Sequence, residues 1–185
     1  MARRRDSSGS LPRRDAPLSR PATASVVVDI ANRQRRVRIG SPWLERIVRR
    51  ALRAEGVGSA EISILLVDDQ RIAAIHQEWM NDPTATDVIT FDLSDPPASR
   101  PDGERILRGD IVVSCQTAVR MAAEYGWTAR QETAYYVLHG ILHLTGHDDL
   151  EPVARRAMRR RERSLLASLG MPLPPRGRRP VRRVR

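Results

Sequence analysis

Three of the four histidines in this chain fall within nine residues, at positions 139, 143 and 147. His139 and His143 are four residues apart in a stretch with helical periodicity, so both imidazoles project from one face of the expected helix. Two neutral imidazoles at this spacing are typical zinc ligands. Packing alone can explain one histidine on an apolar face, but not the glycine and the His-Asp-Asp cluster that follow this pair. The pattern therefore predicts a site for one zinc ion.

The third ligand must come from the residues after this helix. On a straight helix the backbones of residues 139 and 147 would be about 12 Å apart, whereas a zinc–nitrogen bond is about 2 Å long. Gly146 tolerates the left-handed conformation that ends a helix and turns the chain back. The spacing from His139 to Asp149 then matches the ligand spacing of the metzincin zinc proteases. Asp149 is thus the predicted third ligand, and His147 is the alternative.

The residue after the first histidine separates this site from those proteases. They place a glutamate there as general base, whereas this chain has Gly140, so a protease of that mechanism is not expected. Three protein ligands leave the fourth position of a tetrahedral zinc ion to water, as in catalytic sites. The pattern therefore favours a metal-dependent hydrolase, and the candidates for its general base by residue type are Asp148, His147 and Asp87.

Each of these polar residues also has a structural interpretation. Asp148 fits turn chemistry or support of a ligand histidine, and Asp87 fits a hydrogen bond at the start of a strand. The fourth histidine, His76, lies far from the cluster in sequence, and we expect it to be structural. The single cysteine, Cys115, follows an apolar strand and is expected in the core; alone it forms no disulfide within the chain.

The elements that position the histidines follow from periodicity and punctuation. Strands are predicted at 25–30, 35–39, 60–67, 87–93 and 109–114. Helices are predicted from the N-cap Ser41 to Gly56, from Asp68 or Asp69 to the break at 81–83, and at 116–125, 130–144 and 151–169. This irregular alternation predicts a single α+β domain over residues 23–169, with one mixed sheet of about four strands packed with helices. The zinc site would lie at the end of a central helix.

Positive charge is concentrated at the two ends of the chain. Residues 1–20 hold six arginines and two aspartates, and residues 170–185 hold six arginines and no acid, which accounts for the net charge of +10. We predict disordered tails at 1–22 and 170–185, which suit a nucleic-acid partner or serve only as solvated extensions. No apolar run approaches the roughly 20 residues of a membrane span, so no membrane partner and a cytoplasmic location are expected.

The segment from His139 to Asp149 resembles the signature of a known family. It reads His-Gly-Ile-Leu-His-Leu-Thr-Gly-His-Asp-Asp and is similar to the His-Gly-x-Leu-His-Leu-x-Gly-Tyr/His-Asp-His of the YbeY family of bacterial endoribonucleases, also called rRNA maturation factors. Residues 86–91 and 109–114 are similar to its Thr-Asp-Val-Leu-Ser-Phe and Gly-Asp-Ile-x-Ile-Ser strands. Tyr125-Gly126 and Glu132 also have counterparts, and the resemblance covers roughly residues 25–165.

The resemblance implies a fold, a cofactor and a function. It implies one α+β domain with one zinc ion bound by His139, His143 and Asp149. It implies a single-strand-specific endoribonuclease acting on the 16S rRNA precursor, in 3′-end maturation and in quality control of the small ribosomal subunit. The alternatives are a non-catalytic ribosome-assembly factor with a structural zinc, and a zinc hydrolase of another substrate.

Two departures from the family pattern bear on the site. The family's third ligand is normally histidine, and Asp149 stands here; a carboxylate is a competent zinc ligand, but a harder oxygen donor is expected to alter affinity or metal preference. The family also usually has an arginine, assigned to phosphate contact or catalysis, after an aromatic residue in the helix before the Thr-Asp-Val strand. Here Met80 follows Trp79, so no catalytic arginine is carried over, and Arg108 or a tail arginine remains as a substitute.

Overall fold

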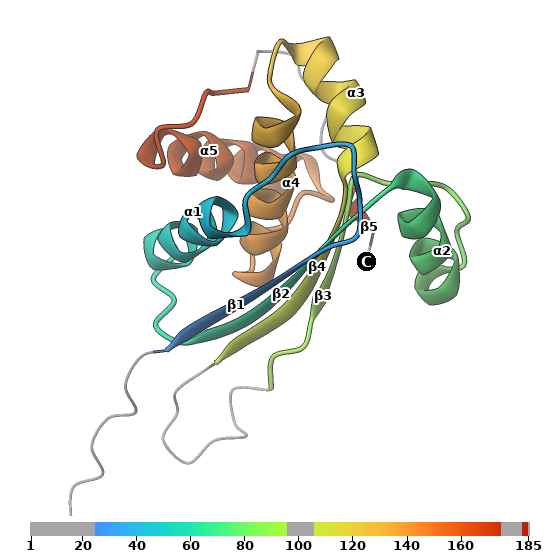
Figure 1. Cartoon of the computed structure of the whole chain (residues 1–185). Coiled ribbons are helices and arrows are strands. Elements are labelled where there is room, and N and C mark those ends of the chain that lie inside the picture. Colours follow the sequence, from blue (N-terminus) through green and yellow to red (C-terminus); the bar gives the residue numbers. More distant parts are fainter. Residues whose placement is uncertain (1–24, 96–105, 175–182, 185) are drawn as a thin grey trace, which may run out of the picture.

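A mixed β-sheet forms the centre of the molecule. The computed structural model describes residues 25–95, 106–174 and 183–184 (Figure 1). The strand order is β1-β2-β4-β3-β5, in which β1, β2 and β4 are parallel, β3 is antiparallel to β4, and β5 is parallel to β3. Four longer strands thus carry the sheet, and β5 adds two residues at its edge. The strands are β1 (Val26–Asn32), β2 (Ala60–Val67), β3 (Val88–Asp92), β4 (Leu107–Ser114) and β5 (Arg183–Val184).

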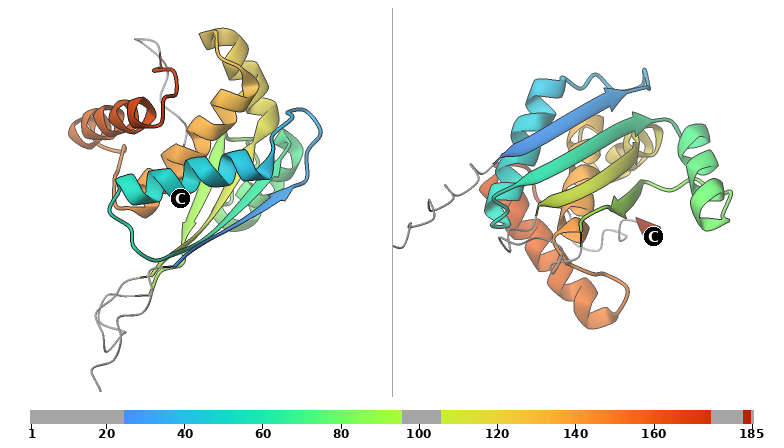
Figure 2. Two further views of the ribbon diagram at one scale, coloured as in Figure 1. Left: turned by 60° about the vertical axis from the view of Figure 1, so that its left-hand side comes forward. Right: turned by 90° about the horizontal axis from the view of Figure 1, so that it is seen from below.

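Helices cover the two faces of this sheet unequally, as Figures 1 and 2 show. One face carries α1, α3 and α4, with α5 packed outside α4, whereas α2 lies on the other face. No helix in the described ranges is long and apolar enough to cross a bilayer. The helices are α1 (Ser41–Ala54), α2 (Asp69–Met80), α3 (Cys115–Tyr125), α4 (Ala129–Leu144) and α5 (Pro152–Ser168). The predicted α+β class and mixed sheet are therefore confirmed.

Helix α4 is the innermost helix, and two glycines let it lie close to the sheet. A Cβ at Gly109 of β4 would lie only 2.6 Å from both Cδ atoms of Leu144 on α4. A Cβ at Gly140 of α4 would lie 3.0 Å from Cγ2 of Ile111 and 3.1 Å from Oγ1 of Thr90. Because side chains in close-packed interiors have little room to shift, these glycines set the distance between α4 and the sheet.

Two local predictions are wrong. Residues 35–39 form no strand, and the chain bends at 35–37. There the Gln34 side chain accepts hydrogen bonds from the backbone N–H groups of Arg36 (2.6 Å) and Val37 (2.9 Å) and donates one to the Val37 carbonyl (3.0 Å). Helix α1 has Gly40 rather than Ser41 as its N-cap, and Ser41 is its first residue.

The predicted tails are mostly beyond the described residues. This holds for all of 1–22 and for most of 170–185. Within the second range, Met171 packs against the main core, and Arg183–Val184 pair with Val88 and Ile89 of β3. The boundary at residue 169 stays a prediction.

Gly109→Ala is expected to destabilise the fold by about 1–3 kcal/mol, because the new methyl group would overpack the contact between β4 and α4. The Leu144 side chain is buried and the Phe91 carbonyl oxygen lies 3.0 Å from the new Cβ position. Urea unfolding followed by circular dichroism measures the effect. Gly58→Ala is the matched control, since no atom lies within 4 Å of its Cβ position. Equal stability of the two variants would contradict the prediction.

Candidate metal centre

The histidine pair lies on the C-terminal half of α4. The helix begins with a capping box, in which the Thr128 side chain accepts from the backbone of Gln131 and the Gln131 side chain accepts from the backbone of Thr128. From Glu132 to Leu144 every residue is buried, as expected of a helix covered by the sheet on one side and by α1, α3 and α5 on the others. The two histidines are therefore carried by a helix with little freedom to move.

Helix α4 ends at the glycine that the sequence singled out. Gly146 has a φ of 96°, which favours glycine. Its N–H donates to the carbonyl of His143 (3.0 Å), and the N–H of His147 donates to that of Leu142 (2.9 Å). These two bonds form a Schellman motif, which ends the helix and reverses the chain. The predicted glycine turn is confirmed, and it brings residues 147–150 back beside the histidines.

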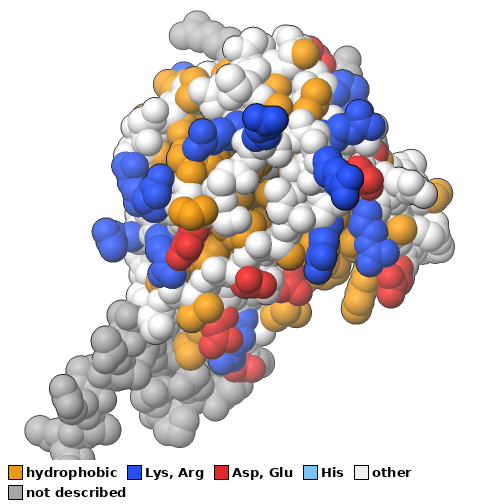
Figure 3. Space-filling view, viewed as in Figure 1, with side chains coloured by type: hydrophobic (Ala, Val, Ile, Leu, Met, Phe, Trp, Pro, Cys, Tyr) orange, Lys and Arg blue, Asp and Glu red, His pale blue; other side chains and the backbone are white. Residues whose placement is uncertain are grey.

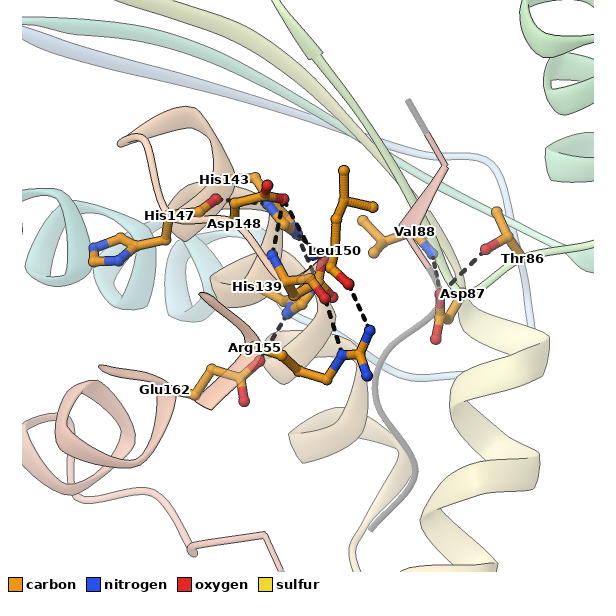
Figure 4. Close-up of polar contacts among 11 residues, drawn as sticks. Thr86, Asp87, Val88, His139, His143, His147, Asp148, Leu150, Arg155 and Glu162 are labelled. Carbon is orange, nitrogen blue, oxygen red and sulfur yellow. Dashed lines mark hydrogen bonds and ion pairs between the residues drawn. The ribbon is translucent and has the colours of Figure 1, made fainter. Parts of the chain in front are cut away.

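The side chains of His139, His143 and Asp149 converge, and Figure 4 shows the two histidines beside the turn that follows α4. The two Nε2 atoms are 2.9 Å apart. Asp149 presents Oδ2 at 3.8 Å from Nε2 of His139 and Oδ1 at 3.7 Å from Nε2 of His143. All three side chains are buried, and their candidate ligand atoms lie within 4.8 Å of one another. Two nitrogens bound to one tetrahedral zinc ion at about 2 Å would be about 3.3 Å apart, so a small shift accommodates an ion.

The outer nitrogens of both imidazoles face acceptors. Nδ1 of His139 lies 2.7 Å from Oε1 of Glu162, and Nδ1 of His143 lies 2.9 Å from the carbonyl oxygen of His147. A neutral imidazole with its proton on Nδ1 has its lone pair on Nε2. The two Nε2 lone pairs therefore point at each other and at a carboxylate. This arrangement is favourable when the three side chains share a cation. Without one, buried lone pairs that face each other and lack a hydrogen-bond donor are destabilising.

The imidazole of His147 does not join this group. Its Nε2 lies 3.3 Å from Oε2 of Glu55, and the side chain is 32% exposed. What His147 contributes to the centre is its backbone carbonyl, which orients the ring of His143. Of the two third-ligand candidates, the structure places Asp149 and not His147 beside the histidine pair.

Glu55 ties this turn to two other elements. Its carboxylate, only 5% exposed, accepts from Nε of Arg161 on α5 at 2.9 Å and contacts His147. Arg161 also donates to the carbonyl of Ala54 at the end of α1 (2.7 Å). A buried carboxylate needs such partners, and the contacts connect α1, the turn after α4 and α5.

The other two candidates for proton transfer take part in local hydrogen bonds. Oδ1 of Asp148 accepts from the backbone N–H of Asp149 (2.8 Å) and of Leu150 (3.4 Å), which is turn chemistry. Oδ1 of Asp87 accepts from the hydroxyl of Thr86 (3.2 Å) and from its neighbour's N–H (3.0 Å) at the start of β3. Figure 4 shows Asp87 on the opposite side of Arg155 from the histidines.

The remaining polar residues of interest lie away from the centre. The buried His76 has Nδ1 2.6 Å from the carbonyl of Thr84. Burial raises the pKa of the Cys115 thiol to about 11, so it is not a nucleophile at neutral pH.

Met80 packs in the apolar cluster beneath α2. Arg108 donates to Glu61 (2.9 Å) and Asp95 (2.7 Å), so these acids already occupy its guanidinium.

Three residues in the surroundings of the centre escaped the sequence reasoning: Glu162, Glu55 and Arg155. Glu162 had a detectable signal, because it lies four residues after Met158 and three before Leu165 on the buried stripe of α5. An acid on such a stripe indicates a buried partner. Glu55 and Arg155 carry no such signal, since their partners are set by the tertiary fold.

Comparisons with known proteins agree with the signature. The model of the family described as Endoribonuclease YbeY matches residues 29–170. The Endoribonuclease YbeY of Clostridium botulinum (strain Eklund 17B / Type B) is 33% identical over 162 residues, which cover 77% of this chain and 98% of that protein. That of Pelotomaculum thermopropionicum is 36% identical over 129 residues, covering 69% and 85%. That of Anaeromyxobacter sp. (strain Fw109-5) is 44% identical over 120 residues, covering 65% of this chain and 60% of that longer protein.

A solved structure shares the fold. The solution structure of TM1509 from Thermotoga maritima superposes with a TM-score of 0.51 at 21% identity, covering 78% of this chain and 92% of that one. At this level of identity the likeness concerns the fold alone.

Glu55→Gln is expected to destabilise the protein by about 1.5–3 kcal/mol, because it weakens charge-assisted hydrogen bonds made by a buried carboxylate. Chemical denaturation measures the change. Glu45→Gln serves as control, since Glu45 pairs with Arg49 at the surface and such pairs contribute at most about 1 kcal/mol. The prediction fails if both variants lose the same small amount of stability.

Proposed function

The chain belongs to the YbeY endoribonuclease family, and we propose that it is a zinc-dependent, single-strand-specific endoribonuclease. Its substrate would be the 16S rRNA precursor in the small ribosomal subunit, and its roles 3′-end maturation and ribosome quality control in the cytoplasm. Support comes from the family match over residues 29–170 and from the cluster of His139, His143 and Asp149.

One observation carries the metal assignment. The Nε2 atoms of His139 and His143 face each other at 2.9 Å while both Nδ1 atoms face oxygen acceptors. These two nitrogens and the carboxylate of Asp149 would hold one zinc ion. A bound zinc ion supplies Lewis-acid polarisation of a phosphodiester and makes a water molecule more acidic at neutral pH.

The side chains around the cluster hold it in place for that chemistry. Glu162 fixes the ring of His139 and the carbonyl of His147 fixes that of His143, which keeps Nε2 as the donor atom of each. For proton transfer the candidates stay Asp148, His147 and Asp87.

Two measurements distinguish the alternative functions: whether the protein unfolds when its metal is removed, and whether the metal-bound protein cleaves RNA. A non-catalytic assembly factor with a structural zinc should unfold when the metal is removed. A zinc hydrolase of another substrate should keep its metal and leave RNA intact. Three protein ligands favour a catalytic site, because structural zinc sites almost always have four.

His143→Ala is expected to abolish both stoichiometric zinc binding and cleavage of single-stranded RNA, because it removes one of three ligands. The fold should persist by circular dichroism, and chelation of the wild-type protein should have the same effect on cleavage. His147→Gln is the matched control, since its ring lies outside the cluster, and it should retain zinc. Cleavage that survives both chelation and His143→Ala would refute the zinc-nuclease proposal, whereas unfolding on metal loss would favour the structural alternative.

The arginine-rich ends are proposed to strengthen RNA binding around a hydrolase domain at 23–169. Replacing the arginines at 3–20 and 176–185 with glutamine keeps the length of the chain and removes the charge. RNA affinity should fall, and the slope of log affinity against log salt should flatten by about 0.7 for each phosphate of a single strand that the ends no longer neutralise. Filter binding at several salt concentrations measures both. Unchanged slopes would show that the ends are inert extensions.

A further inference from the structure

Helix α5 holds the turn that carries Asp149 through one arginine. Nε of Arg155 donates to the backbone carbonyl of Asp149 at 2.9 Å, and Nη2 of Arg155 donates to the backbone carbonyl of Leu150 at 2.7 Å. Figure 4 shows both bonds from the guanidinium to this turn. Arg155 is half-buried, in the first turn of α5, where its own N–H bonds the carbonyl of Glu151 (2.8 Å).

The partners of Arg155 are main-chain atoms. A guanidinium presents its donors in a rigid, planar fork, so bonds to two successive carbonyls fix the direction of the backbone between them. Arg155 therefore sets the position of the Asp149 backbone itself, and the orientation of the carboxylate follows from it. A separate contact, from Glu55 to the ring of His147, holds the same turn at another residue.

A carboxylate ligand requires this restraint more than an imidazole does. The oxygens of aspartate lie nearer to Cα than Nε2 of histidine does, because the imidazole ring adds to the reach. An aspartate can therefore share an ion with the helical histidines only if its backbone comes closer to them. Oδ1 and Oδ2 of Asp149 lie 3.7 and 3.8 Å from the two Nε2 atoms, which is close enough to share one.

We propose that Arg155 is a positioning residue that brings the backbone of Asp149 close enough for its short carboxylate to act as a metal ligand. This rests on the metal role of Asp149 in the proposed function. Arg155 touches neither the ion nor the substrate in this scheme. Its effect is on metal affinity, and it depends on the length of the side chain at position 149.

A purely structural role of Arg155 makes a different prediction. If its two hydrogen bonds only stabilise the start of α5, removing them lowers the unfolding temperature of the metal-free protein and leaves metal affinity unchanged once the protein is folded. A positioning role lowers the affinity of the folded protein. In that case the size of the loss in metal affinity depends on which residue stands at position 149.

A double-mutant cycle on the full chain separates these roles. Zinc affinity is measured by competition with a chromogenic chelator for wild type, Arg155→Ala, Asp149→His and the double variant. Arg155→Ala alone should lower zinc affinity by roughly 10- to 100-fold, the usual cost of losing an outer partner of a metal site. In the Asp149→His background the same change should cost no more than about twofold, because the longer ligand no longer needs the restraint.

Matched variants complete the test. Arg156→Ala removes the next arginine of α5, which is exposed, and should bind zinc as wild type does. Arg155→Gln keeps a single donor group, so its zinc affinity should fall between those of wild type and Arg155→Ala. It also replaces Arg155→Ala in the test if that variant does not fold. Wild-type affinity in both Arg155 variants overturns the proposal, as does an equal loss with Asp149→His. Failure of the zinc-loaded wild type to cleave RNA would refute the nuclease assignment and leave these affinities unaffected.

Discussion

The close packing of α4 against the sheet is the constraint on which the rest of this structure depends. Gly109 and Gly140 remove the side chains that would hold the helix away from β4 and β3. With α1, α3 and α5 on its other sides, α4 is buried along most of its length. A helix fixed this firmly presents His139 and His143 in a constant relation to each other, which a metal site requires before it can discriminate between ions.

Everything else in the centre is arranged around the end of that helix. The turn at Gly146 reverses the chain, and contacts from α1 and α5 then determine where the turn lies. On the face drawn in Figure 3, arginines and acidic side chains both lie at the surface. Residues 1–20 and 170–185 account for the whole net charge of +10, so the domain between them is neutral overall and attracts a polyanion through local groups or through the ends of the chain.

Sequence reasoning succeeded where the signal is local. The predicted strand at 60–67 coincides with β2, and the glycine turn follows from the spacing of Gly146 after the histidines. It failed at 35–39, because a side-chain bond from Gln34 replaces strand pairing there and leaves no periodic trace. Strand order and the contacts of Arg155 were equally out of reach. Arg155 donates to backbone carbonyls. Because every residue has a backbone carbonyl, the sequence does not indicate which of them an arginine will bind.

The position of Gly140 also limits the chemistry of the site. In the metzincin arrangement the residue at this point of the helix supplies the general base. Here a Cβ at that position would press on Ile111 and Thr90 of the sheet, so any longer side chain would enter the core. Position 140 therefore has no room for a base like that of the proteases. In the proposed mechanism the base comes instead from His147 or Asp148 in the turn after α4, or from Asp87 just before β3, so only the ligand spacing is shared with the proteases.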